Sequence, residues 1–251
     1  MIDCQPGGCG RDARMLVKSL RSSPGLPGGP SPAFICSVTT RRIIGCGRLP
    51  EEEAVAYFVE EVSTGTRETD GAAPAAAIKV GYEGHFKEQY RVLLEAAAEA
   101  ARQTDAPLLF HTEAGQNVEA LPTFFEDRGV PGHRLYFCHM DKRPDLGLHR
   151  ELAQAGILLG YDTFVRSTYK PEQNVWPLLK AMVAQGWGDY IALGLDMART
   201  SFWRNFGGQP GLVYLVDKLI PRLRQEGISD EIIAKLTGQN VTQRLARTDV
   251  K

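Results

Sequence analysis

The chain has 251 residues, of which 43% are hydrophobic and 24% are charged, a composition typical of a globular protein long enough to form one large α/β domain. Its 29 basic and 30 acidic residues give a net charge of -1, which indicates neither nucleic acid nor an anionic membrane surface as a partner. We therefore expect a small molecule as the partner.

The sequence also lacks the usual marks of export. No apolar run reaches the roughly 18 residues of a membrane-spanning helix. The first residues, MIDCQPGGCGRD, have neither the basic nor the apolar region of a signal peptide. The five cysteines are scattered and form no zinc-knuckle or disulfide pattern. A reducing cytoplasm is the expected location.

The N-terminal third predicts few regular elements. Short strands are predicted at 1–4 and 33–38, and a helix is predicted at 13–23. A second helix is predicted over 51–63, where apolar residues recur with helical spacing. Segment 24–50 is rich in proline, glycine, serine and arginine, so it is atypical of the pattern that follows.

From residue 76 onward one pattern recurs. A short apolar run ends in a polar residue, an amphipathic helix follows, and a glycine such as Gly156 or Gly186 precedes the next run. The runs are AAIK (76–79), PLLFH (107–111), LYFCH (135–139), GILLGYD (156–162) and YIALGLD (190–196). Alternating units of this kind predict parallel strands covered on both faces, about seven in all.

Polar residues at the strand ends favour a closed barrel over an open sheet. Lys79, His111, His139 and Asp196 each stand at the C-terminal end of an apolar run. In a (β/α)8 barrel these ends converge on one active-site mouth, whereas in an open sheet they are spread along an edge. No GxGxxG motif indicates a dinucleotide-binding fold.

The same residues have functional and structural interpretations. Imidazole and carboxylate groups are ligands that zinc, manganese or cobalt accept. A single strand-end histidine is more often a core residue, Lys79 could pair with a buried carboxylate, and Asp196 could cap the following turn. Two histidines with matching Lys79 and Asp196 favour a metal site.

These motifs resemble the phosphotriesterase-like branch of the amidohydrolase superfamily. The resemblance is strongest in AAIKVGY, LLFHTEAG, FCHMDKRPDL and LGLDMARTSFWRNFGGQPG. It implies a (β/α)8 TIM barrel with two divalent metal ions, zinc or else manganese or cobalt. It also implies a lysine carboxylated by CO2, whose carbamate bridges both ions.

Carried over residue by residue, the resemblance makes Lys79 the carboxylated lysine and His111 and His139 ligands of one metal ion. Asp196 is implied to ligate the other ion and to be the catalytic residue that takes a proton from the bridging hydroxide. The implied reaction is hydrolysis of an ester-type bond by attack of a metal-bound hydroxide.

One departure from the family concerns its first strand, which carries a His-x-His motif. None of the five histidines here forms that motif. We therefore expect one barrel domain over 1–251 that lacks the first strand at its N-terminus, through truncation or a mis-set start. Lys79 and Asp196 are then left for the second metal ion.

Three residues are candidate substrate contacts. Lys170 and Arg199 fall in loops after the last two strands, where they could hold a phosphate or carboxylate, although charged loop residues are often only solvated. The motifs most resemble the family members that hydrolyse phosphorylated sugar lactones, and there these two residues match the phosphate clamp. Tyr82, in the strand of Lys79, is the third candidate.

Other functions stay open. A phosphotriesterase or acyl-homoserine lactone hydrolase would differ only in substrate, and an organophosphate substrate would favour a more apolar pocket. A catalytically impaired remnant could act only as a binding or oligomerisation module, and a homodimer is also left open. Metal content separates these classes, because a working site needs two divalent ions.

Overall fold

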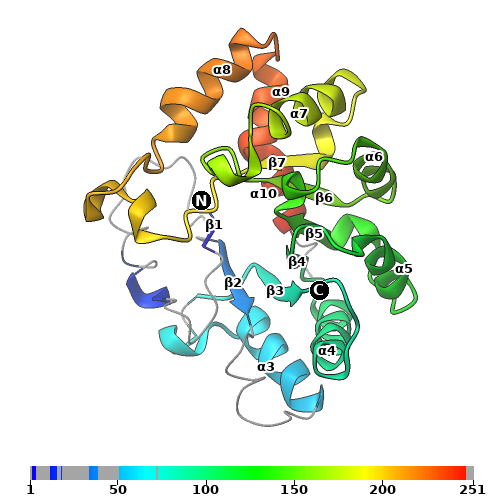
Figure 1. Ribbon diagram of the computed structural model, residues 1–251. Helices are drawn as coiled ribbons and strands as arrows, with labels where there is room; N and C mark the ends of the chain where they lie inside the picture. The colour runs from blue at the N-terminus through cyan, green and yellow to red at the C-terminus, as the bar shows by residue number, and fades with distance from the viewer. Residues whose placement is uncertain are drawn as a thin grey trace. The chain divides into compact units, whose positions relative to one another are not determined.

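The structure is a computed structural model of the chain (Figure 1). It describes residues 2–3, 12–15, 18, 34–38, 51–71 and 73–246. Contacts divide the chain into two compact units. The first comprises Met1–His111, Ala120–Leu135 and Leu245–Lys251, and the second comprises Thr112–Glu119 and Tyr136–Arg244.

The first unit contains the strands from the N-terminal half of the chain. They are β1 (Ile2–Asp3), β2 (Phe34–Val38), β3 (Ala77–Tyr82) and, up to its last residue, β4 (Leu108–Thr112). β1 pairs with β2 and β2 pairs with β3, both in parallel, and the register places Val38 beside Lys79. Parallel pairing requires crossover connections, and helices supply them.

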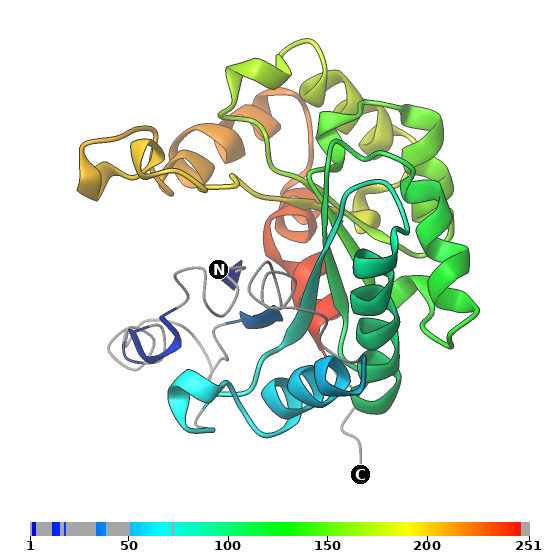
Figure 2. The same ribbon diagram turned by 60° about the horizontal axis from the view of Figure 1, so that its bottom comes forward.

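The helices of the first unit are α3 (Glu51–Ser63), α4 (Glu88–Thr104) and α5 (Leu121–Glu126). α3 packs along α4 (Figure 2) and buries Phe58 and Val62. The ring of Phe110 in β4 packs edge-on against Phe125 of α5, with centroids 5.1 Å apart. Burial of such large side chains is the main source of stability in a fold of this kind.

The second unit contains three parallel strands that position the candidate site. They are β5 (Leu135–Cys138, from its second residue onward), β6 (Leu158–Tyr161) and β7 (Ile191–Leu193). The register aligns Tyr136 with Leu158 and Leu159 with Ile191. Every residue of the three strands is buried, as expected for parallel strands covered on both faces.

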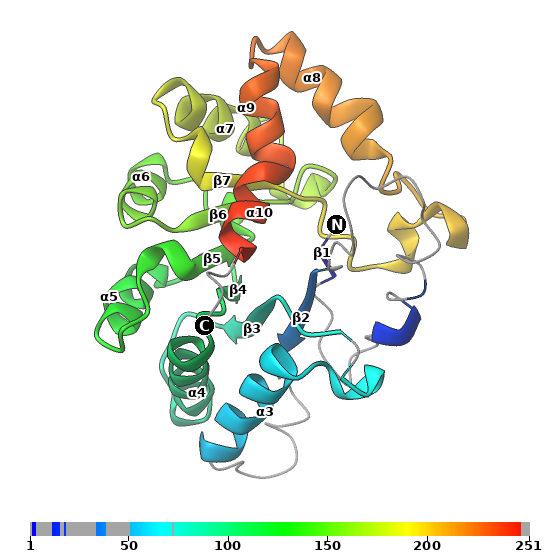
Figure 3. The same ribbon diagram turned by 180° about the vertical axis from the view of Figure 1, so that it is seen from behind.

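Helices alternate with these strands and complete the second unit (Figures 1 and 3). They are α6 (Leu146–Gln154), α7 (Val175–Ala184), α8 (Ile220–Gln225), α9 (Asp230–Ala234) and α10 (Asn240–Leu245). The π-helical segment Lys235–Gln239 joins α9 to α10 and contacts β7. No helix in the described part of the chain is both long and apolar enough to cross a membrane.

Much of the predicted element pattern is confirmed. The described residues contain seven strands, and the helix predicted over 51–63 is α3. Gly156 and Gly186 follow their helices with φ values of 85° each, the left-handed conformation that glycine adopts at low cost. Most of segments 13–23 and 24–50 lies outside the described residues, so those predictions stay untested. The single barrel domain over 1–251 also stays a prediction.

We predict that Asn240 is a main attachment point of the C-terminal helices. Its buried amide donates to the carbonyls of Gly188 and Ile191, each at 2.8 Å. Asn240→Ala leaves both carbonyls without this donor, which should lower the free energy of unfolding by about 2 kcal/mol. Chemical denaturation measures the change. The neighbouring, exposed Gln239 is the control: an equal loss in Gln239→Ala would contradict the prediction.

Candidate metal centre

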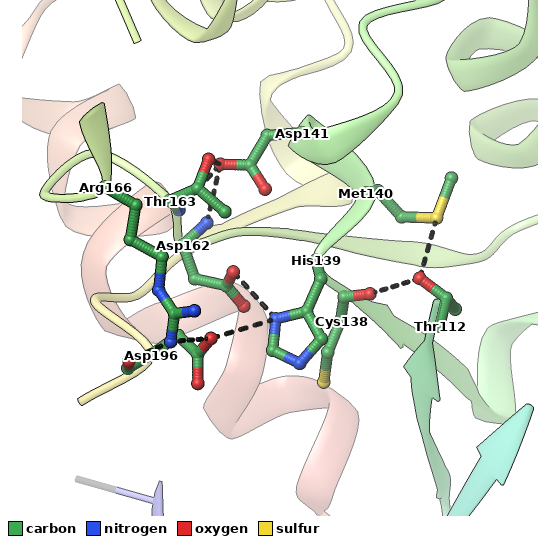
Figure 4. Close-up of polar contacts among 9 residues, drawn as sticks. All are labelled: Thr112, Cys138, His139, Met140, Asp141, Asp162, Thr163, Arg166 and Asp196. Atoms are coloured by element: carbon green, nitrogen blue, oxygen red, sulfur yellow. Dashed lines mark hydrogen bonds and ion pairs between the residues drawn. The ribbon is translucent and has the colours of Figure 1, made fainter. Parts of the chain in front are cut away.

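Three side chains meet beyond the C-terminal ends of neighbouring parallel strands in the second unit. His139 follows β5, Asp162 follows β6 and Asp196 comes shortly after β7. One ligand atom from each lies within 4.8 Å of the others (Figure 4). His139 and Asp162 are buried and Asp196 is half-buried. The arrangement brings one imidazole and two carboxylates to a common point, as a metal site requires.

His139 is held by a hydrogen bond to Asp162. Its Nδ1 lies 2.8 Å from the Asp162 carboxylate and 3.9 Å from that of Asp196. If the carboxylate is the acceptor of this hydrogen bond, Nδ1 carries the proton and a metal ion would bind through Nε2. A histidine ligand whose other nitrogen donates to a carboxylate is a recurring feature of metal sites. Asp162 is therefore placed to orient His139.

Asp141 fixes the turn that carries Asp162. Its Oδ2 accepts from the backbone N–H groups of Asp162 and Thr163, at 2.9 and 2.8 Å, and from the Thr163 hydroxyl at 2.7 Å. Its Oδ1 is buried and makes no hydrogen bond with the described residues. Burial, and then the nearby Asp162 carboxylate, raise the pKa of Asp141 to about 7. Such a crowding of carboxyl groups favours a bound cation.

Two residues of the site have backbone conformations that are unusual for their type. His139 has φ 63° and Asp196 has φ 40°, both in the left-handed region that side chains other than glycine rarely adopt. Each such residue costs about 1–3 kcal/mol unless its surroundings stabilise it. Left-handed residues of this kind cluster at functional sites, so their coincidence here supports a functional role.

A family model described as the phosphotriesterase family matches residues 33–245. The chain belongs to the phosphotriesterase family.

Individual relatives agree with this assignment. A phospho-furanose lactonase from Mycoplasmopsis synoviae (strain 53) is 29% identical over 213 residues, which cover 79% of this chain and 60% of that protein. The crystal structure of an amidohydrolase from Mycoplasma synoviae is similar to this chain with a TM-score of 0.86 and 25% identity, covering 100% of this chain and 75% of that one.

The crystal structure of the phosphotriesterase homology protein from Escherichia coli, complexed with phosphate in its active site, has a TM-score of 0.85 at 23% identity. It covers 98% of this chain and 83% of that one, and at this identity it supports the fold alone. The present chain spans 60 to 65% of the length of the first curated relatives that it matches.

Within the phosphotriesterase-family fold, the structure brings together only part of the predicted site. His139 and Asp196 lie in one cluster. Lys79 and His111 are half-buried at β3 and β4 of the first unit, and Tyr82 is 1% exposed, with its ring 5.5 Å from that of Phe86. The joint placement of these three residues with His139 and Asp196 stays a prediction.

Lys170 and Arg199 are both exposed in the second unit. Lys170 ends the short 3-10 helix Ser167–Tyr169, and Arg199 precedes the one at Thr200–Phe202. Neither side chain forms an ion pair with another described residue, so both are available to a ligand. Their role in substrate binding stays a prediction.

Sequence reasoning missed Asp162, Asp141 and the role of Arg166. Asp162 ends the apolar run GILLGYD as Asp196 ends YIALGLD, so the same pattern could have identified it. Asp141 carried no such signal, because its importance depends on the turn that it closes. Arg166 lies in the same loop as Lys170, and its sequence position does not mark it as a partner of Asp196.

A second buried histidine, His149, does not belong to the metal centre. Its Nδ1 lies 2.5 Å from the Tyr161 hydroxyl and its Nε2 lies 3.0 Å from the Arg143 carbonyl, so both nitrogens are occupied. Burial lowers the pKa of His149 to about 4. The folded chain therefore holds this imidazole neutral at physiological pH.

We predict that His149 makes the fold acid-sensitive. The unfolded chain protonates this histidine below pH 6.5 but the folded chain only near pH 4, so stability falls as pH drops through that window. The loss amounts to about 3 kcal/mol, since each pKa unit corresponds to about 1.4 kcal/mol. Urea unfolding at several pH values should show a shallower pH slope for His149→Gln. Parallel slopes for the two proteins would refute this.

We predict that Asp162 governs metal affinity. Asp162→Ala removes the acceptor for His139 Nδ1 and should weaken cobalt or zinc binding by about ten- to a hundred-fold. Equilibrium titration of the metal-free chain measures the change. Asp217→Asn is the matched control, because it removes one negative charge from an exposed position of the same unit. If both variants bind metal as the unaltered chain does, Asp162 has no part in the site.

Proposed function

We propose that the chain carries the active site of a divalent-metal-dependent hydrolase that opens a phosphorylated sugar lactone. The observation that carries the proposal is the cluster of His139, Asp162 and Asp196 beyond three parallel strand ends. Membership of the phosphotriesterase family and similarity to phospho-furanose lactonases support it.

The residues present fit a divalent ion. Asp141, Asp162 and Asp196 supply an excess of carboxyl groups over the guanidinium of Arg166, and the donor set of imidazole nitrogen and carboxylate oxygen suits zinc, manganese or cobalt. His139 and Asp196 would hold metal ions, together with His111 and a carboxylated Lys79. Half-burial of Lys79 in β3 is consistent with that modification, because burial favours the neutral amine that reacts with CO2.

When bound, the metal ions polarise the lactone carbonyl and lower the pKa of a water molecule toward neutrality. The residues of the chain have the following roles. Asp162 orients His139 through their hydrogen bond, and Asp196 would accept the proton of the attacking water and return it to the leaving alkoxide. Lys170 and Arg199 bind the phosphate of the substrate, and Tyr82 stays a candidate substrate contact.

A binding module without activity is the second candidate. It is favoured by the absence of a His-x-His motif among the five histidines of the sequence. Metal analysis after dialysis distinguishes the two candidates, because the hydrolase holds close to two divalent ions per chain and the module at most one.

We predict that the phosphate handle is recognised by Arg199 and Lys170. With zinc or manganese and bicarbonate added, Arg199→Met and Lys170→Met should each raise KM for a phosphorylated sugar lactone at least about tenfold, the loss expected for one charge-assisted hydrogen bond. KM for the unphosphorylated lactone should change little.

The exposed Arg150 on α6 provides the control variant Arg150→Met, which should leave both KM values unchanged. An equal effect of Arg199→Met on both lactones would assign that residue a structural role. No lactone opening by the metal-loaded chain, at a metal content of two, would refute the proposed reaction.

A further inference from the structure

Arg166 lies in the segment after β6 and contacts Asp196, which comes shortly after β7. Its guanidinium Nη2 donates to the Asp196 carboxylate and also, at 2.7 Å, to the Asp196 carbonyl (Figure 4). Both side chains are mostly buried, at 16% and 19% exposure. One nitrogen thus holds the side chain and the main chain of the same residue.

Arg166 is itself fixed in place. Its backbone N–H donates to the Thr163 carbonyl at 2.9 Å, and its own carbonyl accepts from Tyr169 at 3.0 Å. The guanidinium lies over the ring of Phe202, with 5.6 Å from the guanidinium carbon to the ring centre. The backbone and the guanidinium of Arg166 are thus both held in place. The side chain therefore loses little conformational entropy when it pairs with Asp196, because its planar group is already oriented.

The contact acts on a residue that needs support. Asp196 has a left-handed backbone with φ 40°, which an aspartate adopts only when its surroundings stabilise it. Arg166 donates to both the carboxylate and the carbonyl of Asp196, and the relative position of these two acceptors depends on that backbone conformation. Asp196 Oδ2 faces Arg166 and His139, and its other oxygen makes no hydrogen bond with the described residues.

The guanidinium is directed at Asp196 rather than at a full set of partners. Arg166 Nε is buried and has no hydrogen-bond partner among the described residues, which opposes folding. The contacts of Nη2 with Asp196 are therefore the polar contacts that this side chain makes at the candidate metal centre.

We propose that Arg166 is a positioning residue, which holds Asp196 by one carboxylate oxygen so that the other oxygen is presented to a metal ion. This inference rests on the proposed function only in taking Asp196 as a metal ligand. It does not depend on which bond the enzyme hydrolyses.

The test is cobalt binding by the full-length, metal-free chain and its variants, followed by the visible absorption of the bound ion. Arg166→Met keeps an unbranched apolar stem and removes the charge and the donors of the side chain. It should weaken cobalt binding by about ten- to a hundred-fold and change the absorption spectrum, as loss of an outer-shell partner does. Arg166→Lys keeps the charge and should bind cobalt with an affinity between those of Arg166→Met and the unaltered chain.

Arg134 offers a matched control from the first unit. It too pairs with a carboxylate, that of Asp105, donates to the Ala246 carbonyl at 3.0 Å, and has a buried Nε with no described partner. Arg134→Met should lower the melting temperature of the metal-free chain and leave cobalt affinity and the spectrum unchanged. If the loss of any such arginine had the same structural effect, cobalt binding would weaken equally in Arg166→Met and Arg134→Met.

Cobalt affinity unchanged in Arg166→Met would overturn the proposal, and so would tighter binding, which would show that the guanidinium competes with the metal ion. If Arg166→Met does not fold, Arg166→Lys decides, since it must bind cobalt several-fold more weakly than the unaltered chain. Cobalt binding that depends on Arg166 in a chain that opens no lactone would support this inference and refute the proposed function.

Discussion

The hydrogen bond between His139 and Asp162 is the interaction on which the rest of the site depends. It joins the ends of β5 and β6 and fixes the orientation of the imidazole, and a donating Nδ1 would direct Nε2 to a metal ion. Without it, the left-handed backbone of His139 would have less to stabilise it, and the ring could rotate away from Asp196. A metal site needs ligands that are oriented before the ion arrives, and this bond provides that orientation.

The segment after β6 organises the centre around this bond. Asp141 holds its backbone at Asp162 and Thr163, Asp162 holds His139, and Arg166 holds Asp196. The five residues 162–166 thus connect to both neighbouring strand ends. Neighbouring carboxyl groups repel one another unless a positive charge lies near them; Arg166 pairs with Asp196, while the closeness of Asp162 raises the pKa of Asp141. The remaining excess of carboxyl groups is the electrostatic reason to expect a cation.

The sequence predicted the strands well, because a parallel strand covered on both faces has to be apolar throughout and therefore stands out from its surroundings. The runs at 135–139 and 156–162 correspond to β5 and β6 with their functional residues at the ends. β7 is shorter than its run, since only Ile191–Leu193 is paired and the chain then turns toward Asp196. His139 and Asp196 were predicted from their places at strand ends.

The supporting contacts could not be predicted in the same way. Arg166 and Asp196 are 30 positions apart in the sequence, and Asp141 and Thr163 are 22 apart. Such pairs form only because particular turns aim them at one another, and neither turn leaves a periodic pattern in the sequence. The first-unit residues Lys79, His111 and Tyr82 remain assigned by resemblance to the phosphotriesterase family.

The central claim is that His139 and Asp196 ligate metal ions while Asp162 orients the histidine. A crystal structure of the chain grown with zinc, with anomalous scattering measured at the zinc edge, tests it most directly. The account predicts one zinc peak about 2.0–2.2 Å from His139 Nε2 and a second at that distance from a carboxylate oxygen of Asp196, with Nδ1 still bonded to Asp162. Zinc bound at Nδ1 in place of Asp162, or no peak within bonding distance of His139, would contradict it.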